Sequence, residues 1–337
     1  MTHIIVIPDR ITNPDIEHDH LKSAFGSNYK IVCLGLKNWD DASEEDKEWI
    51  GKANAILAWH DLVYGHNFWK HTSIELQCIV RVGVGVDNVS EFDALTWKTP
   101  ISNVPDYGVN DVADHTLALA LSLARELQCH DTRAKNGDWT WPEYTTLRRI
   151  TDFNIGIVGF GRIGQAVCKR FQAFGCLCMF YDPYVARGVE KVWDTPRYDN
   201  FDTMVMNSDI LTFHVPLTNE TNRMFNSHHL PLIRNNRRDP IILINTSRGG
   251  VVDTDTLMAG MNFEICGLGL DVMEDEPPDD FINWVASTPS TELVDNIIIT
   301  PHMAFLNKQS LEEMRIKAVQ EAIRYLKEIE DPIYRVY

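Results

Sequence analysis

The sequence lacks the residue spacings that are typical of metal sites and shows no cysteine motif. Its seven cysteines are scattered, odd in number and contain no CxxC pair, which favours a reducing compartment over a disulfide framework. Cys168, Cys176 and Cys178 lie in apolar surroundings, as expected of buried thiols. The twelve histidines show no HExxH or comparable spacing. We therefore expect no metal.

Long hydrophobic runs and an excess of positive charge are also missing. The first apolar run, Ile4–Ile7, is too short for a signal-peptide core or a membrane span, and Pro8 ends it. The formal net charge is −17, whereas a nucleic-acid surface needs a basic face. We therefore expect a cytoplasmic protein without a membrane or nucleic-acid partner. An anionic ligand would require cationic groups that are focused inside a cleft.

A glycine-rich turn between a strand and a helix is the clearest feature that is present. Ile155–Val158 is a short apolar run, typical of a strand buried on both faces. Gly159, Gly161 and Gly164 follow in the G-x-G-x-x-G spacing. In this pattern the first glycine permits a tight turn and the second lets the backbone approach a pyrophosphate. The third lets the following helix pack closely on the strand.

The residues after these glycines favour a dinucleotide site. Backbone N–H groups around Arg162 and Ile163 would face phosphates at the positive end of the helix dipole. Residues 165–174 have helical apolar spacing, and Leu177–Tyr181 reads as the next strand. Asp182 ends that strand 18 residues after the last glycine, where a carboxylate takes the ribose hydroxyls of NAD. An Asp-Pro turn is the alternative, but the complete order favours NAD, and the carboxylate should repel the additional phosphate of NADP.

Short apolar strands alternate with helical segments along the whole chain, which predicts parallel sheets with helices on their faces. With 337 residues, two domains are expected. The strands expected before residue 101 are Ile4–Ile7, Tyr29–Leu34, Ala55–Trp59 and Cys78–Val82, with helices over 14–25, 44–52 and 66–76. The strands expected after Asp182 are Ile210–Val215, Ile241–Ile244, Ile265–Leu270 and Ile297–Thr300.

A long helix is expected over residues 109–128. Its stretch 116–124 is apolar nearly all round, so it should be buried or lie in a subunit interface. Trp139 and Trp141 follow in an aromatic loop.

Four polar residues stand just after strands, at the sheet edge where open α/β folds bind ligands. They are Arg248, Asp271, Glu276 and His302. Each has a plausible structural role when it is taken singly: a helix end, a turn cap, a solvated charge or a satisfied core histidine. Together they meet the needs of hydride transfer to a carbonyl, namely a cation for the substrate, an acid for the developing alkoxide and a carboxylate that keeps this acid charged.

Another strand end, at Arg81, carries glycines whose N–H groups could bind an anion. A purely structural turn is equally consistent with these residues.

These motifs resemble the D-isomer-specific 2-hydroxyacid dehydrogenases over essentially the whole chain. The matching segments are Gly159–Gly164, Tyr181–Pro183, His214–Thr218, Asn245–Asp253, Gly269–Pro277 and Thr300–His302. Within the family the chain looks most like the branch of the C-terminal binding proteins. The segments that fit this branch are Val80–Asn88, Ser102–Pro105 and Thr300–Phe305.

The resemblance implies a role for each matching residue. Arg248 would grip the carboxylate and carbonyl of the substrate. His302 would be the general acid in reduction and the base in oxidation, with Glu276 as its partner. Asp271 would hold the nicotinamide carboxamide. Further cofactor-binding residues would be His214, Pro216 and Thr246.

The family's architecture implies a Rossmann-type NAD domain over 102–302 and a discontinuous, flavodoxin-like substrate domain over 1–101 and 303–337. Both would be doubly wound parallel sheets with a cleft between them, and the last helix, about 308–328, would return to the first domain. N–H groups of Val84 and Gly85 would bind the substrate carboxylate, with Arg81 adding charge. Phe305 stands where the C-terminal binding proteins place a tryptophan over the substrate.

Three departures lie on the substrate side. Phe305 replaces that tryptophan, Met303 replaces a small residue, and residues 279–296 form a longer connection than usual. These departures bear on the identity of the substrate and leave the reaction class intact.

Two functions remain open, because the corepressor members that the chain resembles also keep Arg248, Glu276 and His302. The favoured one is an NAD-dependent dehydrogenase of a small 2-oxo or 2-hydroxy acid that forms a homodimer. The alternative is a nucleotide-sensing scaffold like the corepressor members of the family.

Overall fold

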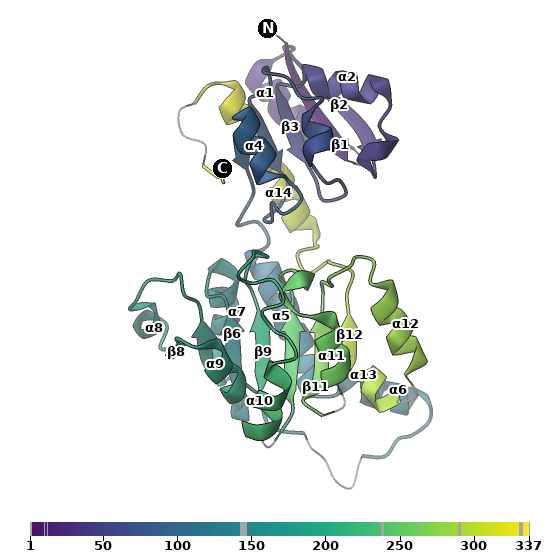
Figure 1. Ribbon diagram of the computed structural model, residues 1–337, viewed down its shortest axis with the longest axis vertical. Coiled ribbons are helices and arrows are strands. Elements are labelled where there is room, and N and C mark those ends of the chain that lie inside the picture. The colour runs from purple at the N-terminus through teal and green to yellow at the C-terminus, as the bar shows by residue number, and fades with distance from the viewer. Residues whose placement is uncertain are drawn as a thin grey trace. The chain divides into compact units, whose positions relative to one another are not determined.

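The chain forms two compact α/β units in the computed structural model, which describes residues 2–9, 11, 13–141, 147–236, 239–261, 263–288, 291–329 and 333–336. The first unit comprises residues 1–108 and 306–337, and the second comprises residues 109–305 (Figure 1). The sequence placed the boundaries at 101/102 and 302/303. In the structure the first boundary lies later, after residue 108, and Ile101–Ser102 belongs to the first unit because it is a short strand that pairs with the strand Cys78–Arg81. The second boundary lies at 305/306.

The first unit is a five-stranded parallel sheet in the order β2-β1-β3-β4-β5. Its strands are β1 His3–Asp9, β2 Tyr29–Leu36, β3 Ala55–Ala58, β4 Cys78–Arg81 and β5 Ile101–Ser102. Its helices are α1 Asp15–Phe25, α2 Glu44–Lys52, α3 His66–Trp69, α4 Glu91–Trp97 and α14 Lys308–Leu326. This flavodoxin-like strand order reverses between β1 and β3, and such a reversal is where open α/β sheets bind ligands.

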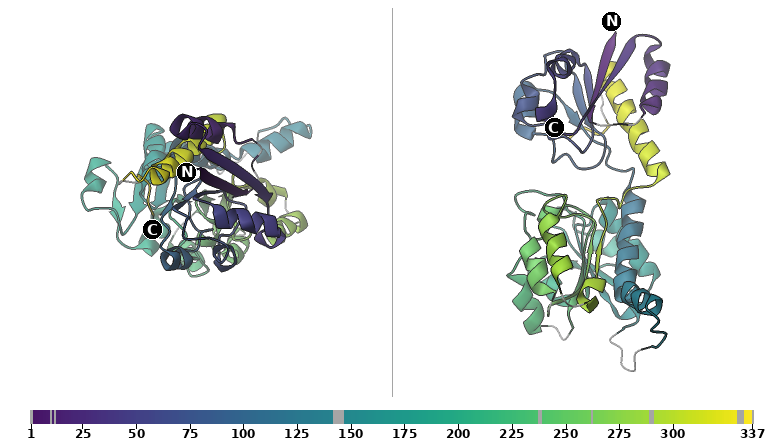
Figure 2. Two further views of the ribbon diagram at one scale, coloured as in Figure 1. Left: turned by 90° about the horizontal axis from the view of Figure 1, so that it is seen from above. Right: turned by 90° about the vertical axis from the view of Figure 1, so that its right-hand side faces the viewer.

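Helix α14, which lies near the C-terminal end of the sequence, belongs to the first unit. It packs on β3 and β4 and lies beside α1, seen in yellow and purple in Figure 2. Arg315 of α14 forms a two-bonded ion pair with Glu17 of α1, with Nε 2.9 Å from Oε1. Since the Glu17 side chain is only 2% exposed, this pair supplies the charge that a buried carboxylate needs.

The second unit is a seven-stranded parallel sheet in the order β12-β11-β10-β9-β6-β7-β8. Its strands are β6 Asn154–Val158, β7 Leu177–Tyr181, β8 Arg197–Tyr198, β9 Ile210–Phe213, β10 Ile241–Asn245, β11 Ile265–Leu270 and β12 Ile297–Ile299. Its helices are α5 Val109–Ala124, α6 Leu127–Lys135, α7 Arg162–Ala173, α8 Val189–Val192, α9 Phe201–Asn207, α10 His229–Asn236, α11 Thr254–Gly260, α12 Asp279–Ser287 and α13 Thr291–Asp295. This is the Rossmann order with one additional strand, so the predicted fold class is confirmed.

Helices cover both faces of this second sheet. Helices α5 and α7 pack on one face and α9 to α12 on the other (Figure 1). Gly267 and Gly269 of β11 let α5 approach closely, because a Cβ on either would meet Leu119 or Leu123 at 3.1–3.4 Å. Burial of these leucines in the unit's own core explains much of the apolar stretch at 116–124.

Two predicted helices are shorter than the sequence suggested. The helix expected over 66–76 ends at Trp69, where the Thr72 hydroxyl bonds back to the Trp69 carbonyl at 2.7 Å. The helix expected over 109–128 breaks at Glu126, which takes the left-handed conformation (φ 49°), and α6 begins at the next residue. Among the described residues, no helix has the length and apolar character needed to cross a membrane.

Candidate active site

The glycine loop after β6 has the geometry of a dinucleotide cradle. Gly159 has φ +88°, and a Cβ there would lie 2.7 Å from the His214 carbonyl oxygen. A Cβ on Gly164 would lie 2.0 Å from the Gly159 carbonyl oxygen. By contrast, a Cβ on Gly161 would have no atom within 4 Å. Two glycines are thus required by the fold itself, while Gly161 faces open space where a pyrophosphate could approach.

The positive end of α7 and the Asp182 carboxylate border this loop. Helix α7 starts at Arg162 and Ile163, and no side chain of the described residues caps its N-terminus. Asp182 Oδ2 accepts a bond of 2.8 Å from the Phe160 N–H inside the glycine loop. Its Oδ1 accepts bonds from the N–H groups of Tyr184 and Val185. Asp182 therefore fixes the loop as well as presenting a carboxylate, and these residues fit a dinucleotide.

His214, after β9, is held neutral beside the loop. Burial lowers the pKa of His214 to about 3. Its Nε2 lies 3.0 Å from the Thr212 hydroxyl, while its Nδ1 is buried and has no hydrogen-bond partner among the described residues. Pro216 is exposed, and its carbonyl accepts a 2.5 Å bond from the Thr221 hydroxyl.

Asn245, the last residue of β10, bonds to the backbone of Arg248, and Thr246 connects the following turn to α5. The Asn245 side chain donates to the Arg248 carbonyl at 2.9 Å and accepts from the Ser247 N–H at 3.0 Å. Thr246 is buried, and its hydroxyl lies 2.9 Å from that of Thr116 on α5. Sequence reasoning gave Asn245 no role. Its position as the last residue of a buried strand was the available signal.

Gly249 brings the Arg248 turn against the segment that leads to Glu276. A Cβ on Gly249 would lie 1.8 Å from both the carbonyl carbon and the oxygen of Met273. Since these are backbone atoms, no side-chain rotation can relieve the overlap. The resulting proximity has an electrostatic effect, because the charge of Arg248 helps to lower the pKa of Glu276.

The Asp271 carboxylate organises the turn after β12. It is 3% exposed, and it accepts bonds from the Thr300 hydroxyl (2.6 Å) and from the Met303 and Ala304 N–H groups (both 2.9 Å). The His302 N–H also donates to the Asp271 carbonyl at 2.8 Å. These bonds hold His302 in the left-handed conformation (φ 50°), a state that is uncommon for residues other than glycine and often occurs at functional sites.

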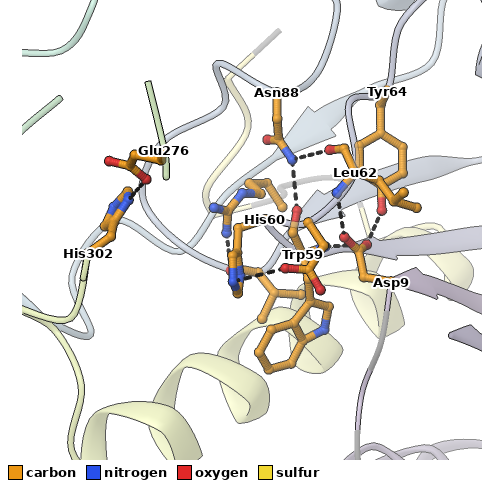
Figure 3. A network of polar contacts seen from close by, with 11 residues as sticks. Asp9, Trp59, His60, Leu62, Tyr64, Asn88, Glu276 and His302 are labelled. Atoms are coloured by element: carbon orange, nitrogen blue, oxygen red, sulfur yellow. Dashed lines mark hydrogen bonds and ion pairs between the residues drawn. The ribbon is translucent and has the colours of Figure 1, made fainter. Parts of the chain in front are cut away.

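His302 and Glu276 form the predicted pair. Nδ1 of His302 lies 2.9 Å from Oε2 of Glu276, as Figure 3 shows. Partial burial tends to raise the pKa of Glu276, but the hydrogen bond and positive charge of His302 outweigh it, aided by the Met273 N–H and Arg248, so this pKa lies below its ordinary value. Both side chains remain about two-fifths exposed. Nε2 of His302 has no hydrogen-bond partner among the described residues, so it is available for a substrate.

In the first unit, the predicted anion turn follows β4. Arg81 folds back over Gly83 (φ +144°) and donates from Nη1 to the Val82 carbonyl. The Val84 carbonyl accepts a 2.6 Å bond from the Asn103 side chain. Within the described part of the chain, the N–H groups of Val84 and Gly85 have no hydrogen-bond partner.

A buried carboxylate that sequence reasoning overlooked lies at the strand reversal of the first sheet. Asp9 ends β1 and accepts bonds from the Tyr64 hydroxyl and from the N–H groups of Trp59 and Leu62 (Figure 3). Burial raises the pKa of Asp9, although these bonds oppose the rise. The Asn88 side chain ties the same loop by donating to the Trp59 and Leu62 carbonyls. The sequence signal for this carboxylate was an acidic residue at the end of a buried strand.

Phe305 is the last residue of the second unit and is half-buried. Arg248, Glu276 and His302 belong to this unit, whereas Arg81, Val84 and Gly85 belong to the first.

Residues 117–304 match the family described as "D-isomer specific 2-hydroxyacid dehydrogenase, NAD binding domain". The chain belongs to this family. Its second unit is accordingly the NAD-binding domain, which confirms NAD as the predicted cofactor.

Individual relatives agree with this assignment. The chain is 31% identical to hydroxypyruvate reductase of Thermotoga maritima, over 74% of this chain and 78% of that protein. It is 33% identical to D-3-phosphoglycerate dehydrogenase of Methanocaldococcus jannaschii over 68% of this chain, a match that spans only 41% of that longer protein. The crystal structure of D-lactate dehydrogenase from Aquifex aeolicus, complexed with NAD and lactic acid, superposes with a TM-score of 0.81 at 27% identity, over 99% of both chains.

We predict that Gly249→Ala destabilises the second unit and lowers kcat/KM. The added methyl group would displace the Met273 backbone, and overpacking of this kind costs about 1–3 kcal/mol. Because Arg248 is the next residue, substrate turnover should fall as well. Urea denaturation and steady-state kinetics would measure the two effects.

Gly250→Ala is the matched control. Its Cβ would meet the ends of two side chains, Leu217 at 3.2 Å and Asn222 at 3.6 Å, and no backbone atom is among its three nearest neighbours, so its cost should stay below about 1 kcal/mol. Equal losses in the two variants would contradict the close approach at Gly249.

Proposed function

We propose that this protein is an NAD-dependent oxidoreductase that interconverts a small 2-oxo acid and its D-2-hydroxy acid. The observation that carries the proposal is the His302–Glu276 pair in an NAD-binding domain. The positive charge of Arg248 helps to lower the pKa of Glu276 in this pair. The relatives named above support the same reaction class. The branch of the C-terminal binding proteins remains an alternative that these relatives do not favour.

The residues divide the chemistry between them. NAD supplies or accepts the hydride when it is bound. Because Glu276 occupies Nδ1 of His302, Nε2 is the nitrogen that donates a proton to the substrate oxygen in reduction and removes it in oxidation. Arg248 would hold the substrate's carboxylate and carbonyl through two directed bonds. Asp271 would position His302 through the turn after β12, and its remaining acceptor capacity would suit the nicotinamide carboxamide.

The substrate side of the proposal rests on the first unit and on Phe305. Val84 and Gly85 would offer their N–H groups to the substrate carboxylate. Arg81 would add positive charge, and Phe305 would contact the substrate's carbon chain.

A screen of 2-oxo acids with NADH, followed by absorbance, tests the proposed reaction. We expect turnover of at least one short 2-oxo acid. In Arg248→Gln, kcat/KM should fall. The loss should correspond to about 3–5 kcal/mol of transition-state stabilisation, as when one partner of a desolvated ion pair is removed. NADH binding should change little. Absence of turnover across the set would favour the scaffold function, and equal loss of cofactor and substrate binding would make Arg248 a structural residue.

The pH dependence of kcat/KM should reveal the carboxylate–imidazole pair. Reduction needs charged His302, so its rate should fall on the alkaline side, while oxidation needs neutral His302 and should rise with pH. Glu276→Gln removes the carboxylate that accepts the bond from Nδ1 of His302. We therefore expect the alkaline limb of reduction to appear at lower pH in this variant than in the parent chain.

His302→Gln provides the comparison for this profile. It should abolish most turnover and leave NADH binding intact. An alkaline limb that stays in place in Glu276→Gln would mean that Glu276 does not assist the proton transfer.

We further propose that the chain forms a homodimer with two-fold symmetry. Trp139 and Trp141 support this, because these residues are 89% and 85% exposed, and paired burial would remove their apolar surface from water. Light scattering should report a dimer at micromolar concentration, and Trp139→Ser with Trp141→Ser should weaken it. A monomeric parent chain would refute the proposal.

A further inference from the structure

A cavity of about 300 Å³ lies at the carboxyl ends of β7 and β8, beside the predicted ribose carboxylate. Asp182, Arg187, Arg197 and Asp199 are among its lining residues. The two strands pair in parallel with Tyr181 opposite Tyr198. Asp182 and Asp199 therefore follow neighbouring strands at equivalent positions.

Asp199 is hydrogen-bonded to Arg187 and lies within ion-pair distance of Arg197, whose Nε has no hydrogen-bond partner among the described residues. Arg187 contacts both oxygens of Asp199, with Nη2 2.9 Å from Oδ1 and Nη1 3.1 Å from Oδ2. Arg197 places Nε 3.5 Å from Oδ1 of the same carboxylate and donates from Nη1 to the Val185 carbonyl. The Arg197 side chain is only 7% exposed, so its charge is held in place at the cavity wall.

The charges in the cavity balance only while Asp199 is present. Two carboxylates and two guanidinium groups sum to zero, which leaves no net attraction for an anion. Without Asp199 the sum is positive. Arg187, whose side chain is 70% exposed, then becomes available at the position that recognises the adenosine ribose, while Arg197 contributes its charge from the cavity wall. Arginines in such a position accommodate the 2′-phosphate of NADP, because their planar fork binds phosphate oxygens in pairs.

We propose that Asp199 is a specificity-determining residue that excludes NADP by neutralising Arg187 and Arg197. Asp182 repels the 2′-phosphate directly, whereas Asp199 withholds the cations that could bind it. This inference rests on the proposed NAD-dependent function. It adds a second acidic residue, which follows a different strand, to the single carboxylate that the glycine motif predicts.

Binding measurements on the full chain test this role without any need for turnover. In Asp199→Asn, the Kd for NADPH and for adenosine 2′,5′-bisphosphate should fall at least about tenfold, which corresponds to about 1.4 kcal/mol. The Kd for NADH and for 5′-AMP should stay within about twofold. Isothermal titration calorimetry at low salt would measure all four ligands.

Two further variants show whether the gain comes from these arginines. Asp199→Asn with Arg187→Gln should lose most of the gain. Arg187→Gln alone should weaken NADPH relative to NADH, because it leaves Asp199 less neutralised. This second variant also covers the case in which Asp199→Asn fails to fold, since the Arg187 side chain is 70% exposed.

Asp114→Asn is the matched control. Asp114 is 68% exposed and pairs with Arg170 at 2.6 Å, so its removal changes the net charge equally. The NADPH-to-NADH affinity ratio should not move in this variant. An equal gain in Asp114→Asn, an unchanged ratio in Asp199→Asn, or a gain that survives Arg187→Gln would overturn the role of Asp199. Failure of the parent chain to bind NADH would instead refute the proposed function, and this inference with it.

Discussion

The candidate active site depends on the hydrogen bonds that the buried carboxylate of Asp271 accepts. These bonds, from Thr300, Met303 and Ala304, fold the chain after β12 into one tight turn. That turn holds His302 in a left-handed backbone conformation, which is uncommon for residues other than glycine. A carboxylate so well supplied with donors tolerates burial, and the cost of the unusual backbone is offset by these bonds.

Close backbone approach places the remaining groups around this turn. Gly249 allows the Arg248 turn to contact the backbone at Met273, and the Met273 N–H in turn donates to Glu276 at 3.3 Å. The positive charge of Arg248 thereby helps to lower the pKa of Glu276, the carboxylate that pairs with His302. Cation, carboxylate and imidazole are thus linked through short backbone segments, and a shift in one segment would disturb all three.

Local arrangement of charge resolves the apparent conflict between an acidic protein and anionic ligands. The net charge of −17 describes the chain as a whole, but Asp182 accepts three backbone N–H bonds. Asp199 is matched by two guanidinium groups. Acidic residues near the glycine loop therefore hold backbone N–H groups or neutralise arginines. The electrostatic potential at a ligand is set by these nearby charges more than by the net charge of the chain.

The sequence by itself determined the fold class, the glycine loop with Asp182, and the strand ends that carry Arg248, Glu276 and His302. These features depend on local periodicity and spacing, which a sequence displays directly. Only the tertiary structure decided the supporting roles of Asn245 and Asp9 and the charge balance at Asp199. Each of these depends on which strands become neighbours and on hydrogen bonds between distant residues, as between Asp9 and Leu62. Such contacts form only when the sheet assembles, because the order of its strands brings together residues that are far apart in the sequence.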